Sequence, residues 1–78
     1  MIRELDLVVL THDVNEHKLK SGDVGTVVHC YSDKEGFEVE FVTGEGKTMA
    51  VLTLTKADIR PFEHSEILHS RQVTSITA

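Results

Sequence analysis

Residues 19–31 read LKSGDVGTVVHCY, in which two glycines flank Asp23-Val24 and a run of β-branched residues follows. A phosphate-binding P-loop needs GxxxxGK[ST] before a helix, and a dinucleotide site needs GxGxxG between a strand and a helix. Here Gly22 and Gly25 are three residues apart, no lysine follows in the loop, and the next element has the composition of a strand. We therefore interpret this stretch as a turn that leads into a strand.

Backbone geometry explains the residues of this turn. Gly22 suits a turn position with positive φ, and Gly25 permits a bulge or a close backbone approach where the strand bends. We expect the Asp23 carboxylate to accept hydrogen bonds from backbone N–H groups of the same turn. A second glycine-bearing turn, with Gly44 and Gly46, is predicted between two later strands.

Strand signals continue along the chain. The clearest is FEVEFV at residues 37–42, which alternates apolar and acidic residues with the period of a half-buried strand. Its core face should carry Phe37, Val39 and Phe41. The predicted strands are residues 5–10, 24–31, 37–42, 47–55 and 60–62. Short antiparallel strands with one longer loop after the first predict an all-β fold, a small five-stranded SH3-like (KOW-like) antiparallel barrel.

The character of the chain changes after Phe62. Residues 63–78 read EHSEILHSRQVTSITA and are polar with scattered apolar residues. We expect residues 1–62 to form the barrel. We expect residues 63–78 to form a C-terminal extension that is mobile or becomes ordered against a partner.

Length and composition indicate one small cytoplasmic domain. The chain has 78 residues, so its core is small. A single cysteine, Cys30, excludes an internal disulfide and is typical of a reducing compartment. No apolar run approaches the roughly 20 residues that cross a bilayer. The apolar N-terminal patch is interrupted by Glu4 and Asp6 and does not have the pattern of a signal peptide.

No arrangement of reactive residues predicts catalysis. The five histidines have none of the spacings typical of metal sites. His29 and Cys30 are adjacent on a predicted strand and should point to opposite faces, with Cys30 half-buried against the core. Glu38 and Glu40 have no second group placed to raise either pKa. We therefore expect a protein that is not an enzyme, with no catalytic residue, metal or cofactor.

The charge balance disfavours nucleic acid as a partner. Thirteen acidic residues against eight basic ones give a net charge of −5, and the basic residues are dispersed among acidic ones. Without a basic stripe, counterion release contributes little to binding. However, the segment GDVGTVVHCY resembles the KOW element of ribosomal and transcription-factor barrels. That resemblance implies RNA binding, so a KOW-like nucleic-acid-binding module remains the alternative function.

The segments DLVVLTHDV, LKSGDVGTVVHCY, FEVEFVTGEGKT, LTL and DIRP carry a broader resemblance. From residue 5 to about residue 62, the chain resembles the small bacterial proteins grouped as Domain of Unknown Function 4926. The resemblance implies a stand-alone SH3-like module, a partner protein encoded in the same operon and no described catalytic residue. The chain departs from the family pattern at Cys30, where a branched apolar residue is expected, and in its extension beyond Phe62.

We therefore predict a non-enzymatic protein-interaction module, the acidic antitoxin-like or regulatory member of a two-protein operon. The protein partner, or a second copy, would bind through strand edges or through residues 63–78. The residues predicted for a partner surface are Glu38, Glu40, Arg60 and Tyr31. The competing interpretation of Glu40 and Arg60 is an ion pair across strands.

Overall fold

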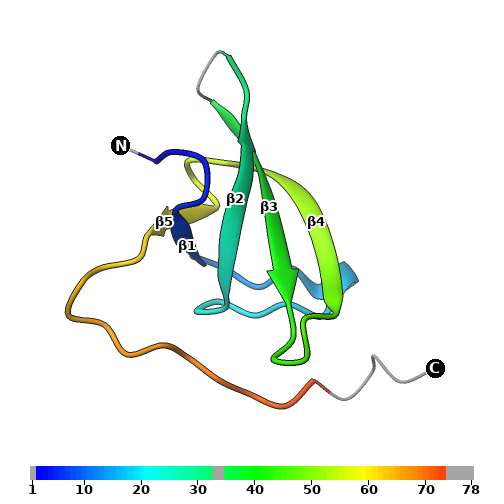
Figure 1. Cartoon of the computed structure of the whole chain (residues 1–78). Helices are drawn as coiled ribbons and strands as arrows, with labels where there is room; N and C mark the ends of the chain where they lie inside the picture. The colour runs from blue at the N-terminus through cyan, green and yellow to red at the C-terminus, as the bar shows by residue number, and fades with distance from the viewer. Residues whose placement is uncertain (1, 33–34, 74–78) are drawn as a thin grey trace.

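The computed structural model describes residues 2–32 and 35–73 (Figure 1). Its elements are β1 (Leu7–Leu10), the 3-10 turn η1 (Asn15–His17), β2 (Val24–Cys30), β3 (Gly36–Val42), β4 (Thr48–Thr55) and β5 (Ile59–Pro61). Two parts of earlier predictions lie outside the described residues. These are residues 33–34 of the turn before β3 and residues 74–78 of the C-terminal extension.

The all-β prediction is confirmed. The five strands form one antiparallel sheet in the order β4-β3-β2-β1-β5. The predicted closure of this sheet into an SH3-like barrel stays a prediction. The proline of β5 is its last residue, as expected for a residue that cannot donate to the ladder. Among the described residues, no helix has the length and apolar character needed to cross a membrane.

One face of the sheet carries the core. In β3, Phe37, Val39 and Phe41 are all buried, as the alternation predicted. Their β4 partners in the ladder are Leu54, Leu52 and Ala50, which belong to or pack against the same apolar cluster. Burial of each large apolar side chain contributes about 1.5–3 kcal/mol, so this cluster is the main source of stability.

Gly25 of β2 lies close against residues of β3. A Cβ atom at this position would be 2.6 Å from Val39 Cγ1 and 3.0 Å from the Glu40 carbonyl oxygen. Two carbon atoms in contact are ordinarily about 3.5–4.0 Å apart, so these β3 groups can lie this close to residue 25 only because it has no side chain. Further along β2, the register shifts between Val27 and His29, which marks a bulge that bends the strand.

After β5, residues 63–73 form neither a helix nor a strand. We call them the C-terminal segment. Figure 1 shows this segment returning past the end of the sheet that carries the β1–β2 loop and the β3–β4 hairpin. The structure thus describes one conformation of the segment, held by the side chains described below. Its predicted ordering by a partner stays a prediction.

Candidate functional site

The β1–β2 loop holds the Asp23 carboxylate in a fixed position. The Asp23 carbonyl accepts the Leu10 N–H at 2.9 Å, and the Leu10 carbonyl accepts the Gly22 N–H at 2.9 Å. Gly22 has a φ of 96°, a value that favours glycine. The Lys20 N–H donates to Asp23 Oδ2 at 2.9 Å, which is the turn hydrogen bond that the sequence predicted. Hydrogen bonds within the loop therefore orient the carboxylate without a contribution from the C-terminal segment.

The C-terminal segment supplies the other partners of this carboxylate. Arg71 Nε donates to Asp23 Oδ1 at 2.8 Å, and Arg71 Nη2 donates to Oδ2 at 2.6 Å. The same Nη2 donates to the Lys18 carbonyl at 2.9 Å. His69 Nε2 lies 3.2 Å from Asp23 Oδ1. Bidentate contacts of this kind are among the stronger and more directional ion pairs in proteins.

The environment of Asp23 keeps it ionised. Its side chain is only 11% exposed, and this burial by itself would raise the carboxyl pKa. The hydrogen bonds from Arg71 and from the Lys20 N–H outweigh burial and hold the pKa of Asp23 below its ordinary value. An ionised carboxylate with this geometry is suited to binding a cationic side chain. It is not suited to accepting a proton as a general base near neutral pH.

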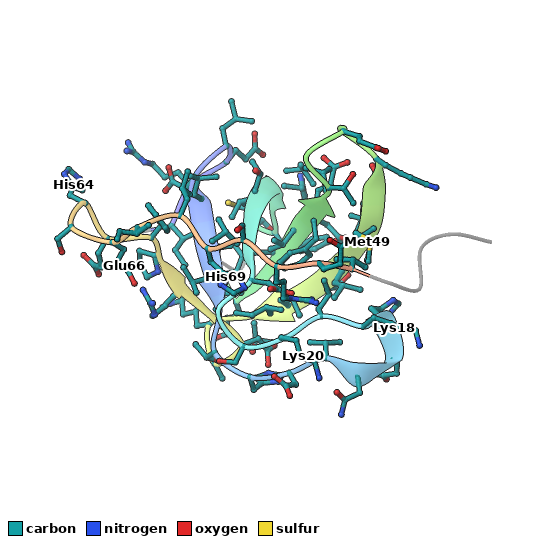
Figure 2. The ribbon with its side chains drawn as sticks, turned by 90° about the horizontal axis from the view of Figure 1, so that it is seen from below. Lys18, Lys20, Met49, His64, Glu66 and His69 are labelled. Atoms are coloured by element: carbon teal, nitrogen blue, oxygen red, sulfur yellow. The ribbon has the colours of Figure 1, made fainter. Side chains whose placement is uncertain are left out.

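The space around this ion pair forms a groove, which we call the Asp23 groove. It has a volume of about 290 Å³ and lies between the β1–β2 loop, the β3–β4 hairpin and residues 69–73. Leu19, Phe41 and Met49 contribute apolar walls. Figure 2 shows the segment crossing the molecule at His69, between the loop that carries Lys20 and the strand that carries Met49.

A second ion pair fixes the start of the segment. Arg60 Nη1 and Nη2 donate to the two carboxylate oxygens of Glu66 at 2.8 and 2.6 Å. Hydrogen bonding to Arg60 lowers the pKa of Glu66 to about 2. The predicted ion pair between Glu40 and Arg60 is therefore wrong. Arg60 pairs with a residue six positions later in its own chain segment, and β3 and β5 are not neighbours in the sheet.

Val9 of β1 is buried in the sheet between Arg60, which is one anchor of the segment, and Val24, which follows the other anchor, Asp23. Val9 pairs with Arg60 on one side and with Val24 on the other, so these three residues share one face of the sheet. Val9 is only 4% exposed although it is not part of the core cluster. In contrast, Ile67 and Leu68, which also lie between the anchors, are 92% and 64% exposed. The segment is thus held by charged side chains while two of its apolar side chains face solvent.

The residues predicted for a partner surface lie in three places. Tyr31 and Glu38 are together, because the Tyr31 hydroxyl and the Thr53 hydroxyl both donate to the Glu38 carboxylate. These hydrogen bonds, from Thr53 and then from Tyr31, lower the pKa of Glu38. Glu40 lies further along β3 and accepts a hydrogen bond from the Thr48 hydroxyl. Arg60 is on β5.

His12, His29 and His69 have separate partners. His12 bonds to Asp58 at 2.7 Å, and this hydrogen bond raises the pKa of His12. His29 packs edge-on against Tyr31, with ring centroids 4.8 Å apart. Residues 2–32 and 35–73 contain no cluster of three or more side chains able to hold a metal ion. Cys30 is half-buried and packs against the core cluster, as the parity of its strand predicted.

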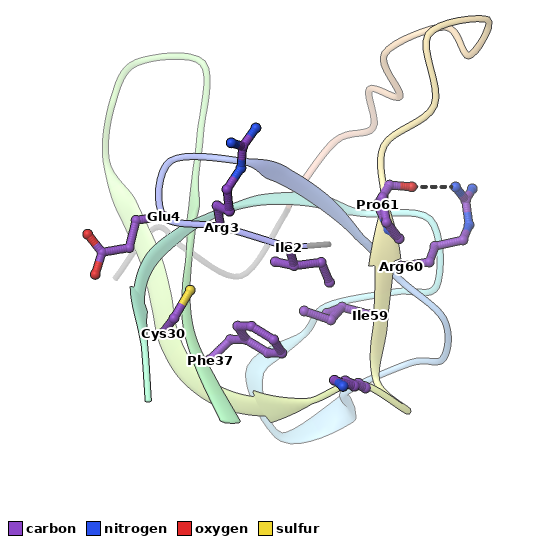
Figure 3. A pocket seen from close by; sticks show the side chains of 9 residues that line it. Ile2, Arg3, Glu4, Cys30, Phe37, Ile59, Arg60 and Pro61 are labelled. Atoms are coloured by element: carbon purple, nitrogen blue, oxygen red, sulfur yellow. Dashed lines mark hydrogen bonds between the residues drawn. The ribbon is translucent and has the colours of Figure 1, made fainter. Parts of the chain in front are cut away.

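A larger hollow lies at the other end of the sheet. Its volume is about 580 Å³, and its lining is mostly apolar. Figure 3 shows Ile2, Phe37 and Ile59 grouped at its centre, while the side chains of Arg3 and Glu4 point away from it. No pair of ionisable side chains in this hollow forms an ion pair or hydrogen bond that indicates catalysis. We therefore place the candidate site at the Asp23 groove.

Sequence reasoning did not identify Arg71 and His69 as parts of this site. Both lie 46 or more positions from Asp23, so no local spacing connects them. One signal was available. Arg71 is the only lysine or arginine in residues 63–78, and a carboxylate fixed in a turn is a natural partner for such a residue.

Comparisons with curated proteins and with solved structures give no match. A family model does match, over residues 4–61 of the 78. The matched region includes the five strands and Asp23, whereas Glu66, His69 and Arg71 lie beyond it. The chain therefore belongs to the family described as Domain of unknown function (DUF4926).

Proposed function

We propose that this protein is a non-enzymatic, cytoplasmic protein-interaction module that binds an extended segment of a partner protein at the Asp23 groove. In this proposal it is the acidic, antitoxin-like or regulatory member of a two-protein pair. One observation carries the proposal: the sheet already holds an extended peptide, its own C-terminal segment, through the bidentate contact between Arg71 and Asp23.

The groove has the properties expected of a peptide site. Its cationic ligand meets a preorganised carboxylate, and apolar walls lie beside it. Main-chain contact is also present, because the Lys18 carbonyl accepts a hydrogen bond from the bound arginine. Preorganised sites lose less entropy on binding, which favours the capture of a flexible segment.

The net charge supports a basic partner. A charge of −5 on 78 residues attracts basic proteins at long range and accelerates their encounter. The same charge repels phosphate backbones. The basic residues are dispersed among acidic ones along the sequence, so we do not propose the nucleic-acid alternative as a second function.

Affinity capture with two baits tests this proposal. The tagged wild-type chain and the variant Asp23→Asn, which has nearly the same shape, are each exposed to lysate of the source cells. We expect the wild type to retain one protein partner in a stoichiometric complex. The asparagine bait should lose it, because an amide cannot accept both arms of a guanidinium as a carboxylate does.

Two results would contradict the proposal. One is a purified wild-type protein that remains monomeric and retains no partner. The other is a partner retained equally by both baits, since it would bind elsewhere. Circular dichroism of the Asp23→Asn variant serves as the control for folding. A gel shift with RNA and DNA at near-physiological salt serves as the control for the alternative, and we expect no shift.

A further inference from the structure

We propose that the Asp23 groove is a receptor for one arginine side chain on a basic, extended segment of the partner, and that Arg71 occupies this receptor until the partner displaces it. This inference rests on the proposed function and names the chemistry that the partner must carry. It starts from the fact that the groove is already occupied by an arginine of the same chain.

The receptor and its occupant come from different parts of the chain. Lys20, which fixes the Asp23 carboxylate, lies inside the region that the family model matches. Arg71 and His69 lie outside that region. The receptor is therefore a property of the folded sheet and its loop. The arginine that fills it is supplied by an addition to that unit, and an arginine from another protein can take the same place.

The geometry selects arginine over lysine. Arg71 uses Nε and Nη2 to reach both oxygens of Asp23, and Nη2 also reaches the Lys18 carbonyl. These three acceptors are met from two nitrogens of a planar group. A lysine ammonium presents its donors from a single nitrogen and cannot reproduce this side-on fork. A partner lysine should bind more weakly than a partner arginine.

The neighbourhood of Arg71 indicates the rest of the ligand. After a turn at residues 64–65 the segment forms no helix or strand and runs across the end of the sheet (Figure 1), so we expect the bound peptide to be extended. His69, two residues before the arginine, lies 3.2 Å from Asp23 Oδ1 and favours a second basic residue at that position. The remaining space of about 290 Å³ beside the segment can take further side chains. The expected ligand is thus a short basic peptide with an arginine.

Displacement requires that the resident segment be loosely held. Ile67 and Leu68 are largely exposed, and each anchor of the segment is a single ion pair whose arginine is partly exposed. Such a segment competes mainly because it is tethered, which gives it an effective concentration of roughly millimolar. Removing Arg71 should therefore open the receptor to a peptide added in solution.

A peptide titration tests this inference with the full-length chain. The probe is the synthetic peptide HSEILHSRQV, which copies residues 64–73. We expect the variant Arg71→Ala to bind it about tenfold or more tightly than the wild type, because the resident arginine no longer competes. The amide signals of Lys20 and Asp23 should shift in nuclear magnetic resonance spectra as the peptide is added.

Matched controls separate specific recognition of the arginine side chain from a general effect of net charge. Arg3→Ala removes the same charge far from the groove and should bind the peptide like the wild type. Against the Arg71→Ala chain, replacing the peptide's arginine by lysine should weaken binding, and replacing it by alanine should abolish it. These peptide changes leave the receptor untouched, so they remain informative if a variant such as Asp23→Asn folds poorly.

Three outcomes would overturn the inference. The first is equal binding of the arginine and alanine peptides to the Arg71→Ala chain. The second is an absence of binding altogether. The third is a wild-type dimer that dissociates in the Arg71→Ala variant, because the occupant would then be the segment of a second copy. A partner captured through Asp23 by affinity while the peptide fails would leave the proposed function standing and remove only the arginine assignment.

Discussion

The sheet and the C-terminal segment are held by different forces. Nine buried apolar side chains and four antiparallel ladders hold the sheet together. The segment has no ladder, and its described anchors are two arginine–carboxylate pairs, Arg60 with Glu66 and Arg71 with Asp23. Apolar burial involves no charges for salt to screen, whereas ion pairs within reach of solvent are screened by it.

Because of this difference, we expect the sheet to determine the stability of the fold and the ion pairs to determine the position of the segment. Substitutions in the sheet should change the free energy of unfolding. Substitutions at the anchors should instead change where the segment lies while the sheet stays folded. Single substitutions can measure how completely these two effects separate.

Phe41→Ala should have the largest effect. The side chain is 3% exposed and lies in the core cluster, so its truncation should lower the free energy of unfolding by about 3–5 kcal/mol. The neighbouring residue supplies the control. Val42 is 52% exposed, and Val42→Ala should change stability by no more than about 0.5 kcal/mol. Urea unfolding measures both, and similar values would contradict the assignment of the core face.

Gly25→Ala should come next. The added methyl group would meet Val39 Cγ1 at 2.6 Å and Phe41 Cε1 at 2.7 Å, which overpacks the core by about 1–3 kcal/mol. Gly44→Ala is the matched control, since no atom lies within 4 Å of a Cβ at that turn position. Thermal unfolding should show a lowered midpoint for the Gly25 variant alone. An unchanged midpoint would mean that β2 and β3 do not approach as described.

Arg71→Ala should affect the segment far more than the sheet. Asp23 is buried largely by the segment and its loop, so release of the segment lets water solvate the carboxylate, and the free energy of unfolding should fall by only about 1 kcal/mol. Amide hydrogen exchange within residues 63–73 should nevertheless accelerate, while exchange in β2 and β3 stays slow. A global loss of protection would show that the segment is part of the folding unit and would contradict the separation of the two effects.

Glu66→Gln should have the smallest effect. The change removes the carboxylate that pairs with Arg60, but the second anchor at Asp23 remains. We expect faster amide exchange confined to residues near Glu63, whose N–H donates to Glu66. The Arg71 contacts should persist. Loss of those contacts in this variant would show that the two anchors depend on each other.

The sheet could be predicted from the sequence because its signals are local. FEVEFV alternates apolar and acidic residues with the two-residue period of a strand. The prediction that Phe37, Val39 and Phe41 are buried is confirmed. The candidate site could not be predicted in the same way. Its two charged halves, Asp23 and Arg71, are 48 residues apart and are brought together only by the path of the chain after β5. The partner of Arg60 was misassigned for a different reason, since Glu66 is only six positions away but lies in a stretch that forms neither a helix nor a strand.

Acid should release the segment at Asp23, because docking needs the ionised carboxylate and the pKa of Asp23 sets the pH at which it is protonated. The folded-state pKa of Asp23 is lowered from the ordinary aspartate value of 3.8. The stabilisation that the ionised carboxylate gives to the docked segment is therefore complete above pH 3.8 and is lost as pH falls through the folded-state pKa. The contribution of Asp23 to docking should therefore weaken as pH falls below about 4. Asp23→Asn should remove this dependence.

The Arg71 side chain offers the most direct test of the central claim that an arginine occupies the Asp23 groove. Its Nε–H donates to Asp23 at 2.8 Å, so its resonance should be shielded from exchange with water near neutral pH. The exposed Arg3 gives the reference within the same molecule. We predict an Arg71 Nε–H signal that exchanges much more slowly than that of Arg3 and becomes as fast in the Asp23→Asn variant. Equal exchange of the two arginines in the wild type would contradict the account.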